Sequence, residues 1–352
     1  MKSLLLNIIL SVFLLSFICV GCREKSSFLV EETIPLYSYQ QELLSDLEPF
    51  TDSTFVVELK SEGNEVFGVP AKCVFHDSKI IVLEKVGYTE QKLRVFDASG
   101  TYLYQVGETG RGPGEYLDIS DFAVSPDGFV WIEDARANRV LKYGPNYRYV
   151  ESVPMPVDVE CFVFLDDNTL LAGIAPWESD GHQIVVTDTQ FVAKSVELSF
   201  SKYNDPNFRF SSPSFMKDNN RYFYSRPIDD NIYLCDASGT LVKRYYLDFG
   251  KATVPLEDRV DAGNKIEYNY FKDYTLLLSF GVVGERYVIG RMYDKGYTRQ
   301  FIADRENEII YKSEAGSVDS SFIGYSDGYL ISVIEPEEDS GCYKLEFRRI
   351  RI

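Results

Sequence analysis

One pattern of short strands repeats along almost the whole chain, and it constrains the fold more than any other feature. Residues 97–101, with the sequence DASGT, recur identically at residues 236–240. Each copy follows an alternating apolar stretch, at residues 93–96 and 232–235, and precedes another strand-like stretch. Aspartate and glycine supply the turn that joins two antiparallel strands. The two copies therefore predict β-hairpins built on one plan.

Weaker copies of this unit, a polar turn followed by an apolar strand, occur six times. They begin at His76, Pro126, Asp166, Asp218, Gly284 and Ser326. Successive copies are 50, 40, 52, 66 and 42 residues apart. A period of about 40–50 residues made of four strands is typical of a propeller blade. We predict an all-β fold, a six-bladed β-propeller of four-stranded antiparallel blades.

The two ends of the chain complement each other. The last repeat ends after about three strands, which would leave an exposed sheet edge. Residues 54–59, just before the first repeat, form a spare strand of the right length. We expect this N-terminal strand to complete the sixth blade and close the ring. The alternative is a two-sheet sandwich domain with an extension.

The charge of the chain limits its partners. It contains 54 Asp and Glu residues against 36 Lys and Arg residues, so its formal net charge is −18. Such a chain has no means of releasing counterions from phosphates, and we predict no nucleic-acid partner. It also lacks a basic patch that would bind an anionic membrane surface.

Residues that carry metal or nucleophile chemistry are scarce. The only two histidines, His76 and His182, share no motif, which argues against a zinc site. No Gly-x-Ser-x-Gly nucleophile motif occurs. Four cysteines beyond the N-terminal region lie in apolar, strand-like stretches, and we predict buried free thiols rather than disulfides. These are Cys73, Cys161, Cys235 and Cys342.

The N-terminus has the pattern of an export signal. A positively charged start precedes an apolar stretch at residues 4–20, and Gly21 and Cys22 follow. This stretch is shorter than a membrane span and fits a signal peptide. A small residue before a cysteine resembles the bacterial lipobox, although Cys19 stands where that pattern prefers leucine. We predict a signal peptide over residues 1–21 and lipidation of Cys22.

The remaining chain divides into two parts. Residues 22–50 are predicted to be a tether, and residues 51–352 the propeller domain. Multiple acyl chains anchor a protein stably where one chain does not. We expect a lipid-anchored protein of the cell envelope, at the outer membrane, facing either the periplasm or the cell surface.

The most specific stretch is residues 110–116, with the sequence GRGPGEY. Together with the lipobox and the sixfold repeat, it is similar to the six-bladed β-propeller lipoproteins common in Bacteroidetes, which carry Gly-x-Gly-Pro-Gly-Glu-Tyr after blade one. The blade pattern alone also resembles NHL-type propellers. The resemblance covers residues 22–352. It implies the propeller fold and an exported, lipid-anchored location, and it implies no reaction.

The same stretch has two interpretations from its residues. Three glycines around one proline exclude the interior of a strand or helix. They predict a fixed loop between blades one and two, beside the channel mouth. In the first interpretation the loop is a rigid linker, with Glu115 and Tyr116 holding neighbouring backbone. In the second, Arg111 and Glu115 present opposite charges to a ligand, beside Tyr116.

The inner strands are expected to place one residue per blade at the channel mouth. The predicted residues are Lys72, Asp121, Glu160, Ser214 and Asp319. The carboxylates of Asp121, Glu160 and Asp319 form a candidate calcium site, because calcium takes six to eight oxygen ligands. They suit sugar hydroxyls or a solvated ring equally well. Trp177, in a polar loop, is either a platform for a sugar ring or part of the aromatic core.

These features favour a non-catalytic binding or scaffold module. We expect it to recognise a glycan, a peptide or an envelope protein at the channel face. The alternative is a divalent-cation-dependent enzyme, a hydrolase or lyase, with a channel-centred site for a carbohydrate or lactone-like substrate. Calcium is its candidate cofactor. Three converging carboxylates would favour the enzyme, and exposed aromatic side chains would favour the binding module.

Overall fold

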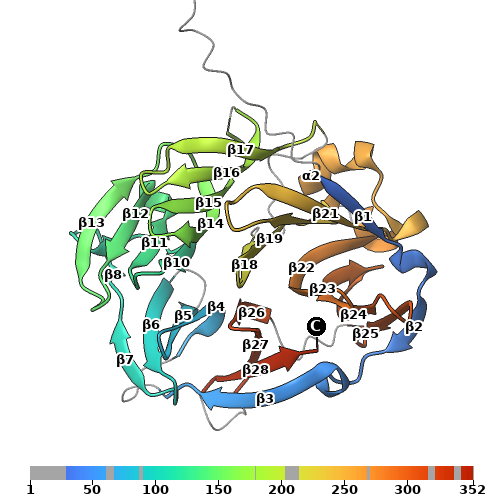
Figure 1. The fold of residues 1–352 in the computed structure, drawn as a ribbon, viewed down its shortest axis with the longest axis horizontal. Helices are drawn as coiled ribbons and strands as arrows, with labels where there is room; N and C mark the ends of the chain where they lie inside the picture. Colours follow the sequence, from blue (N-terminus) through green and yellow to red (C-terminus); the bar gives the residue numbers. More distant parts are fainter. Residues whose placement is uncertain are drawn as a thin grey trace, which may run out of the picture.

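The computed structural model describes residues 29–60, 67–86, 90–178, 180–202, 214–267, 270–315, 322–336 and 342–351. These residues form six sheets of four or five strands, each with four antiparallel strands, arranged as a ring around a central axis (Figure 1). The predicted signal peptide and the lipidation site Cys22 lie outside them. Within the described ranges, no helix is both long and apolar enough to cross a bilayer.

The first three blades each contain four consecutive strands, ordered from the axis to the rim. Blade one has β4 (Val69–His76), β5 (Lys79–Val86), β6 (Glu90–Asp97) and β7 (Tyr102–Gln105). Blade two has β10 (Asp121–Val124), β11 (Val130–Asp134), β12 (Arg139–Tyr143) and β13 (Tyr149–Pro154). Blade three has β14 (Val159–Asp166), β15 (Thr169–Ile174), β16 (His182–Asp188) and β17 (Ala193–Ser199).

The last three blades also recruit strands from the N-terminal region. Blade four has β18 (Ser214–Asp218), β19 (Arg221–Ser225), β20 (Asn231–Cys235) and β21 (Leu241–Leu247). Blade five has β22 (Thr275–Val283), β23 (Tyr287–Asp294), β24 (Tyr297–Asp304) and β25 (Ile309–Lys312). Blade six has β26 (Phe322–Ser326), β27 (Tyr329–Ile334), β28 (Lys344–Ile350) and β3 (Thr51–Glu58). The predicted six-bladed all-β fold is confirmed.

The ring closes as expected. Strand β3 pairs antiparallel with β28, so that the N-terminal strand becomes the outer strand of blade six. Phe55 of β3 lies opposite Phe347, and their rings stack with centroids 4.6 Å apart. Because this pairing joins the two ends of the chain, the last sheet has no missing strand.

The segment predicted to be a tether contributes two further strands. β1 (Val30–Ile34) pairs in parallel with β21, and β2 (Gln40–Leu43) pairs in parallel with β25. Two short 3₁₀ helices, η1 (Leu36–Ser38) and η2 (Glu48–Phe50), follow them. Residues 30–50 are therefore built onto the rim of blades four and five instead of extending from the propeller.

The DASGT repeat forms two equivalent turns. Asp97 accepts hydrogen bonds from the backbone N–H groups of Ser99, at 2.8 Å, and Thr101, at 3.0 Å. Asp236 accepts the matching pair at 2.8 Å and 3.1 Å. Gly100 and Gly239 have φ values of 83° and 82°, which suit glycine. The identical sequences thus encode the hairpins at the rims of blades one and four.

The hydrophobic core lies between neighbouring blades. Trp131 of blade two packs edge-on against Phe164 of blade three, with ring centroids 5.4 Å apart. Phe223 and Phe280 make the corresponding contact between blades four and five at 6.4 Å. The free thiols predicted from the sequence are confirmed for the four cysteines in the described ranges, of which all but Cys342 are buried.

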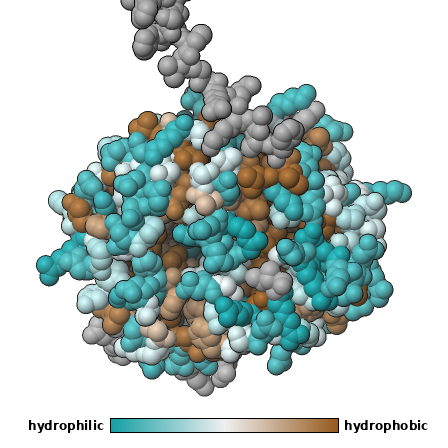
Figure 2. Space-filling view, viewed as in Figure 1, coloured by the Kyte–Doolittle hydropathy of each residue, from teal (hydrophilic) through white to brown (hydrophobic). Residues whose placement is uncertain are grey.

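Strand directions define one functional face of the ring. Because neighbouring strands alternate in direction, the inner strands begin where the second strands end and the third strands begin. We call this end the channel face. It carries the loop at residues 110–116, the β19–β20 loop at 226–230, and the β21–β22 connection at 248–274. Figure 2 shows one face of the disc, with hydrophilic residues predominating and hydrophobic patches between them.

Short elements complete the channel face. They are β8 (Glu108–Thr109), β9 (Glu115–Tyr116), η3 (Ala135–Ala137), η4 (Gly250–Ala252), η5 (Leu256–Asp261), α2 (Ala262–Glu267) and η6 (Tyr270–Asp273). The last four belong to the β21–β22 connection. Figure 1 shows this connection beside the outer strands of blades three and four.

Candidate functional site

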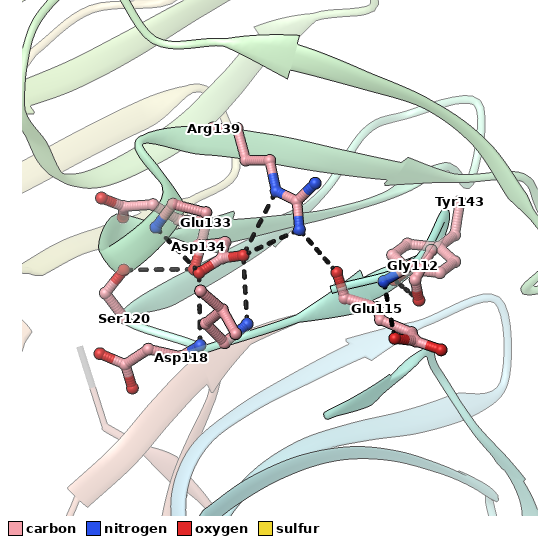
Figure 3. Close-up of polar contacts among 11 residues, drawn as sticks. Gly112, Glu115, Asp118, Ser120, Glu133, Asp134, Arg139 and Tyr143 are labelled. Atoms are coloured by element: carbon pink, nitrogen blue, oxygen red, sulfur yellow. Dashed lines mark hydrogen bonds and ion pairs between the residues drawn. The ribbon is translucent and has the colours of Figure 1, made fainter. Parts of the chain in front are cut away.

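The glycine-rich loop at residues 110–116 folds back on itself. β8 and β9 pair in parallel across it, and the Glu115 carboxylate accepts a hydrogen bond from the backbone N–H of Gly112 at 2.7 Å (Figure 3). A Cβ atom at Gly110 would lie 2.0 Å from Oε2 of Glu115. A larger residue at Gly110 would therefore displace the Glu115 carboxylate from this position.

Asp134 holds the loop from the neighbouring strand β11. Its side chain is fully buried, and Arg139 donates to its Oδ2 at 3.3 Å (Figure 3). Arg139 also donates to the carbonyl of Glu115 at 2.8 Å. Asp134 further accepts hydrogen bonds from three backbone N–H groups, those of Leu117, Asp118 and Ala137. One buried carboxylate thus fixes both the loop and the start of blade two.

Two tyrosines complete this support. The Tyr143 hydroxyl donates to the carbonyl of Gly114 at 2.9 Å, and Tyr116 is only 1% exposed. Arg111 is exposed and makes no ion pair with any described residue. The contacts of Glu115 and Tyr116 match the rigid-linker interpretation. A ligand-binding role for these three residues stays a prediction.

The predicted channel residues are tied together across blades. Lys72 of β4 donates to the Asp121 carboxylate at 2.5 Å and to the carbonyl of Phe122 at 2.8 Å. Asp121, on β10, also accepts from the backbone N–H of Phe162, on β14, at 3.1 Å. A single carboxylate thus links the inner strands of blades one, two and three.

The Glu160 carboxylate on β14 pairs with a different cationic side chain. Arg226, just after β19, donates to it at 2.5 Å, and the two side chains are 6% and 14% exposed for Arg226 and Glu160. Sequence reasoning did not single out Arg226. It lies in the β19–β20 loop, and nothing in its local sequence indicates that it reaches blade three.

Glu133 is the least satisfied carboxylate at the channel. It is fully buried on β11, opposite Asp121, and neither carboxylate oxygen has a hydrogen-bond partner among the described residues. Burial raises the pKa of Glu133 well above its ordinary value, and the Asp121 charge raises it further. Lys72 lowers this pKa in part.

The candidate calcium site is not assembled by the described residues. They contain no group of three or more potential ligands among His, Cys, Asp and Glu. Asp121 and Glu160 each face a cationic side chain, and Asp319 lies outside the described ranges. Ser214, at the start of β18, is exposed. The calcium prediction therefore gains no support from this geometry.

Trp177 lies on the channel face of blade three, in the β15–β16 loop. It is 39% exposed, and its indole N–H donates to Asp158 at 2.5 Å. The ring is thus fixed at its edge and outside the core. Its role as a sugar platform stays a prediction.

A cavity of about 620 Å³ opens on the channel face between blades three and four. The β21–β22 connection forms its third wall. Blade three contributes Gln183, Leu198, Ser199 and Ser201, blade four Asp229, Asn231, Tyr233, Arg244 and Tyr246, and the connection Thr253, Val254, Pro255, Leu256 and Arg259. Its size is within the range of small-ligand pockets.

Several buried polar atoms of this pocket have no hydrogen-bond partner among the described residues. They are Gln183 Nε2, Asp229 Oδ2, Asn231 Oδ1, Arg244 Nε and Thr253 Oγ1. Three of these groups lie near a tyrosine hydroxyl, Gln183 near Tyr224, Asp229 near Tyr233 and Thr253 near Tyr246, but the five atoms do not reach hydrogen-bonding geometry. Buried polar groups are normally paired, so this concentration calls for an explanation.

The β21–β22 connection is anchored by Arg259. Its guanidinium donates to Asp230 at 2.8 Å and to the carbonyl of Asp229 at 3.1 Å. Asp230 also accepts from the backbone N–H of Leu277 on β22 at 3.0 Å. Burial raises the pKa of Asp230 to about 6, against the lowering effect of Arg259. The pocket wall is thereby fixed to blades four and five.

A family model described as a domain of unknown function, DUF4934, matches residues 31–346. The chain belongs to the DUF4934 family. A comparison with curated proteins finds no match.

Two solved structures resemble the DUF4934 chain. A Bacteroides fragilis protein described as a candidate exported protein has a TM-score of 0.72 at 16% identity, covering 92% of this chain and all of its own. A DUF4221 family member from Bacteroides vulgatus has a TM-score of 0.54 at 10% identity, covering 86% of this chain and 97% of its own. At these identities the similarity shows the propeller fold.

The family match includes both parallel N-terminal strands, because it begins within β1. In the DUF4934 chain the pocket was not predicted from the sequence, although one signal pointed to it. The longest spacing between repeats, 66 residues, lies between the fourth and fifth copies. The β21–β22 connection accounts for the excess length, and extra length in a loop is often functional.

Proposed function

We propose that this DUF4934 protein is an exported, lipid-anchored binding module, and that its ligand occupies the pocket between blades three and four. The unpartnered polar atoms of the pocket carry this proposal. A buried polar atom without a partner costs about 1–3 kcal/mol, and a bound ligand that supplies the partner removes that cost.

The centre of the channel supports the same choice. Asp121 and Glu160 are already paired with Lys72 and Arg226. These pairs join neighbouring blades and leave neither carboxylate free for a ligand. No cluster in the described residues favours the cation-dependent enzyme. We therefore propose the pocket as the binding site, where five unpartnered atoms surround one cavity, in preference to the channel, where Glu133 is the one unpartnered carboxylate among the predicted site residues and their neighbours.

The proposed location rests on two observations. Gly21 and Cys22 end an apolar stretch as in a lipobox. The Bacteroides fragilis protein of similar fold is described as a candidate exported protein. Replacing Cys22 by alanine is expected to move the protein from the membrane fraction to the soluble fraction and to abolish its labelling by a palmitate analogue. Unchanged labelling of Cys22→Ala would contradict the anchor.

Binding is tested with one substitution at the pocket and one matched control. Ser199 lines the pocket, whereas Ser195 is exposed on the same strand and does not. Ser199→Trp is expected to fill the mouth, and Ser195→Trp is expected to leave it open. The full-length protein is screened for thermal stabilisation by panels of oligosaccharides and peptides.

The outcomes are distinct. A ligand at 100 times its Kd raises the free energy of unfolding by about 2.7 kcal/mol, which is well within reach of such a screen. Stabilisation that persists in Ser195→Trp and disappears in Ser199→Trp supports the pocket. Stabilisation that survives in Ser199→Trp places the ligand elsewhere, and stabilisation by no compound contradicts the binding proposal.

A further inference from the structure

We infer that the pocket ligand is a neutral, hydroxyl-rich molecule, and that its chemical class is an oligosaccharide. This inference rests on the proposed binding function and adds the ligand class. Four observations carry it: the mixture of unpartnered donors and acceptors, the balance of charges, the apolar wall, and the pairing of the strands behind the pocket.

The unpartnered atoms are of both kinds. Gln183 Nε2 and Arg244 Nε are donors, Asp229 Oδ2 and Asn231 Oδ1 are acceptors, and the Thr253 hydroxyl can act as either. A hydroxyl group donates one hydrogen bond and accepts others through the same oxygen. A ligand with several hydroxyls therefore satisfies such a mixed set. A ligand with donors only, or acceptors only, leaves part of it unsatisfied.

The charges of the pocket do not select a charged ligand. Arg244 and Asp229 bring opposite charges to it, and Arg259 is occupied by Asp230 and by backbone carbonyls. Arg244 also faces Glu31 of β1 at 2.7 Å. Burial raises the pKa of Asp229, and Asn231 and Tyr233 lower it in part, followed by the charges of Arg259 and Arg244. An anion would meet Asp229 and a cation would meet Arg244, so a neutral ligand fits best.

The wall of the pocket is partly apolar. Leu198, Val254 and Pro255 line it together with the rings of Tyr233 and Tyr246. Sugar rings carry hydroxyls at their edges and C–H groups on their faces. They therefore match a pocket in which polar atoms lie beside apolar and aromatic surface.

The blade-four strands behind the pocket argue against an extended peptide on that side. A peptide that binds by strand addition needs an unpaired sheet edge. β20 lies between β19 and β21, and β21 lies between β20 and β1. Both blade-four strands of the pocket are thus paired on each side, and they offer side-chain atoms instead of a backbone edge. The one edge strand at the pocket is β17 of blade three, which pairs only with β16 among the described strands, and the peptide set in the test below covers strand addition there.

The inference is tested by calorimetry on the full-length protein. Three sets of compounds are compared at about four to six units each, a length that suits a pocket of this size. They are neutral oligosaccharides of glucose, galactose, mannose and N-acetylglucosamine, uronic-acid oligosaccharides, and mixed peptides. Binding is measured in the unaltered protein, Ser199→Trp, Ser195→Trp and Asp229→Asn.

We expect a neutral oligosaccharide to bind, and Ser199→Trp to weaken it at least about tenfold. Asp229→Asn removes the charge and replaces one acceptor oxygen by an amide nitrogen, so we expect a modest loss of affinity, of about two- to fivefold. The affinity should also be nearly equal at about 50 and 500 mM NaCl, because no ligand charge is screened.

Other results would overturn either the ligand class or the proposed binding function. Binding that Ser199→Trp removes, but that is limited to uronic-acid oligosaccharides or peptides, overturns the ligand class and leaves the binding function. A gain in affinity in Asp229→Asn indicates an anionic ligand, and a loss of tenfold or more indicates a cationic one. Absence of binding in all three sets overturns the proposed function itself.

Discussion

Two regions of the channel face contrast in how they treat polar groups. Around the loop at residues 110–116, the side chains of Asp134, Arg139 and Glu115 all have hydrogen-bond partners within the protein, although the buried Tyr116 hydroxyl has none among the described residues (Figure 3). In the pocket between blades three and four, five buried polar atoms have none among the described residues. The loop connects blades one and two, and one wall of the pocket is the connection between blades four and five, on the same end of the ring.

This difference between the loop and the pocket bears on where we propose that a ligand binds. The glycine-rich loop has the most specific sequence of the chain, yet the Glu115 carboxylate and the carbonyls of Gly114 and Glu115 are bound within the protein and fix the passage from blade one to blade two. The pocket has no sequence motif, but five of its buried polar atoms have no partner among the described residues. A specific motif can thus mark a structural requirement, while a site for a ligand is marked by what remains unpaired.

The largest expected loss of stability follows from a substitution that removes the support of the loop at residues 110–116. Asp134→Ala removes the acceptor of three backbone N–H groups and of Arg139. We expect a loss of about 3–4 kcal/mol in the free energy of unfolding, because a partly buried cation and buried donors lose their partner. Urea denaturation measures the loss. Ligand affinity at the pocket should not change in the folded fraction.

Glu151→Ala is the control for this prediction. Glu151 is 52% exposed and faces only Lys142, at 3.5 Å. Its replacement should cost less than about 0.5 kcal/mol. If Asp134→Ala were as mild as Glu151→Ala, the loop would not depend on its internal hydrogen bonds, and the contrast with the pocket would lose its basis.

The second prediction concerns Asp230, which holds the pocket wall and makes the stability of the protein depend on pH. The pKa of Asp230 is about 6 in the folded protein against 3.8 as its ordinary value. Between about pH 4 and 6 the folded state therefore holds more protons than the unfolded state, and this contribution to stability falls as pH rises. Below about pH 4 both states are protonated, and the contribution is fully present.

Asp230→Asn isolates the pH-dependent contribution of this side chain to stability, because asparagine does not titrate. The stability advantage of the unaltered protein over Asp230→Asn should shrink by about 2–3 kcal/mol from pH 4 to pH 7. Denaturant unfolding at several pH values measures it. A constant difference across that range would show that Asp230 titrates alike in both states, and a growing one would reverse the sign.

Two glycines allow a smaller loss of stability to be compared between the loop at residues 110–116 and a loop of blade three. Gly114, in the loop, has a φ of +77°, and a Cβ there would lie 2.8 Å from Cβ of Tyr149. Gly181, in the β15–β16 loop of blade three, has a φ of +66° with no described heavy atom within 4 Å. Alanine at either position requires a left-handed backbone, at a cost of about 1–2 kcal/mol.

The crowding at Gly114 adds to this cost. We expect Gly114→Ala to lose about 2–3 kcal/mol in total and Gly181→Ala about 1 kcal/mol. Thermal unfolding of the two variants, side by side, measures the difference. Equal losses would mean that the loop is not more tightly packed than the blade-three connection.

The sequence predicted the architecture because its signals are local and repeated. The DASGT turns fix two hairpins, the repeat spacing sets the number of blades, and the spare strand at residues 54–59 indicates closure. β1 and β2 were missed because a short parallel strand on a rim leaves only a weak alternating pattern. Their assignment depends on partners about 200 residues away, such as Arg244 for Glu31.

The site was less predictable, because it depends on which side chains meet. Asp121 and Glu160 were correctly expected on inner strands, but their cations, Lys72 and Arg226, are determined by blade packing. Gln183 and Asn231 belong to different blades and have no shared motif. Absence of a hydrogen-bond partner is a property of the folded molecule, and no spacing in the sequence encodes it.

The smallest change in the free energy of unfolding is expected for a substitution of Gln183. Its direction, a gain or a negligible loss, would distinguish the pocket from the loop, where we expect a large loss. Gln183 is 2% exposed, and its amide nitrogen has no partner among the described residues. Methionine has a similar volume and no group that needs one. Gln183→Met should therefore leave the free energy of unfolding within about 1 kcal/mol, or raise it, because an unsatisfied buried donor is removed. Urea denaturation measures this change, and calorimetry should show weaker ligand binding in the same variant. A loss of stability comparable to that of Asp134→Ala would mean that the Gln183 amide is needed by the fold itself, and the pocket would then be a structural region like the loop.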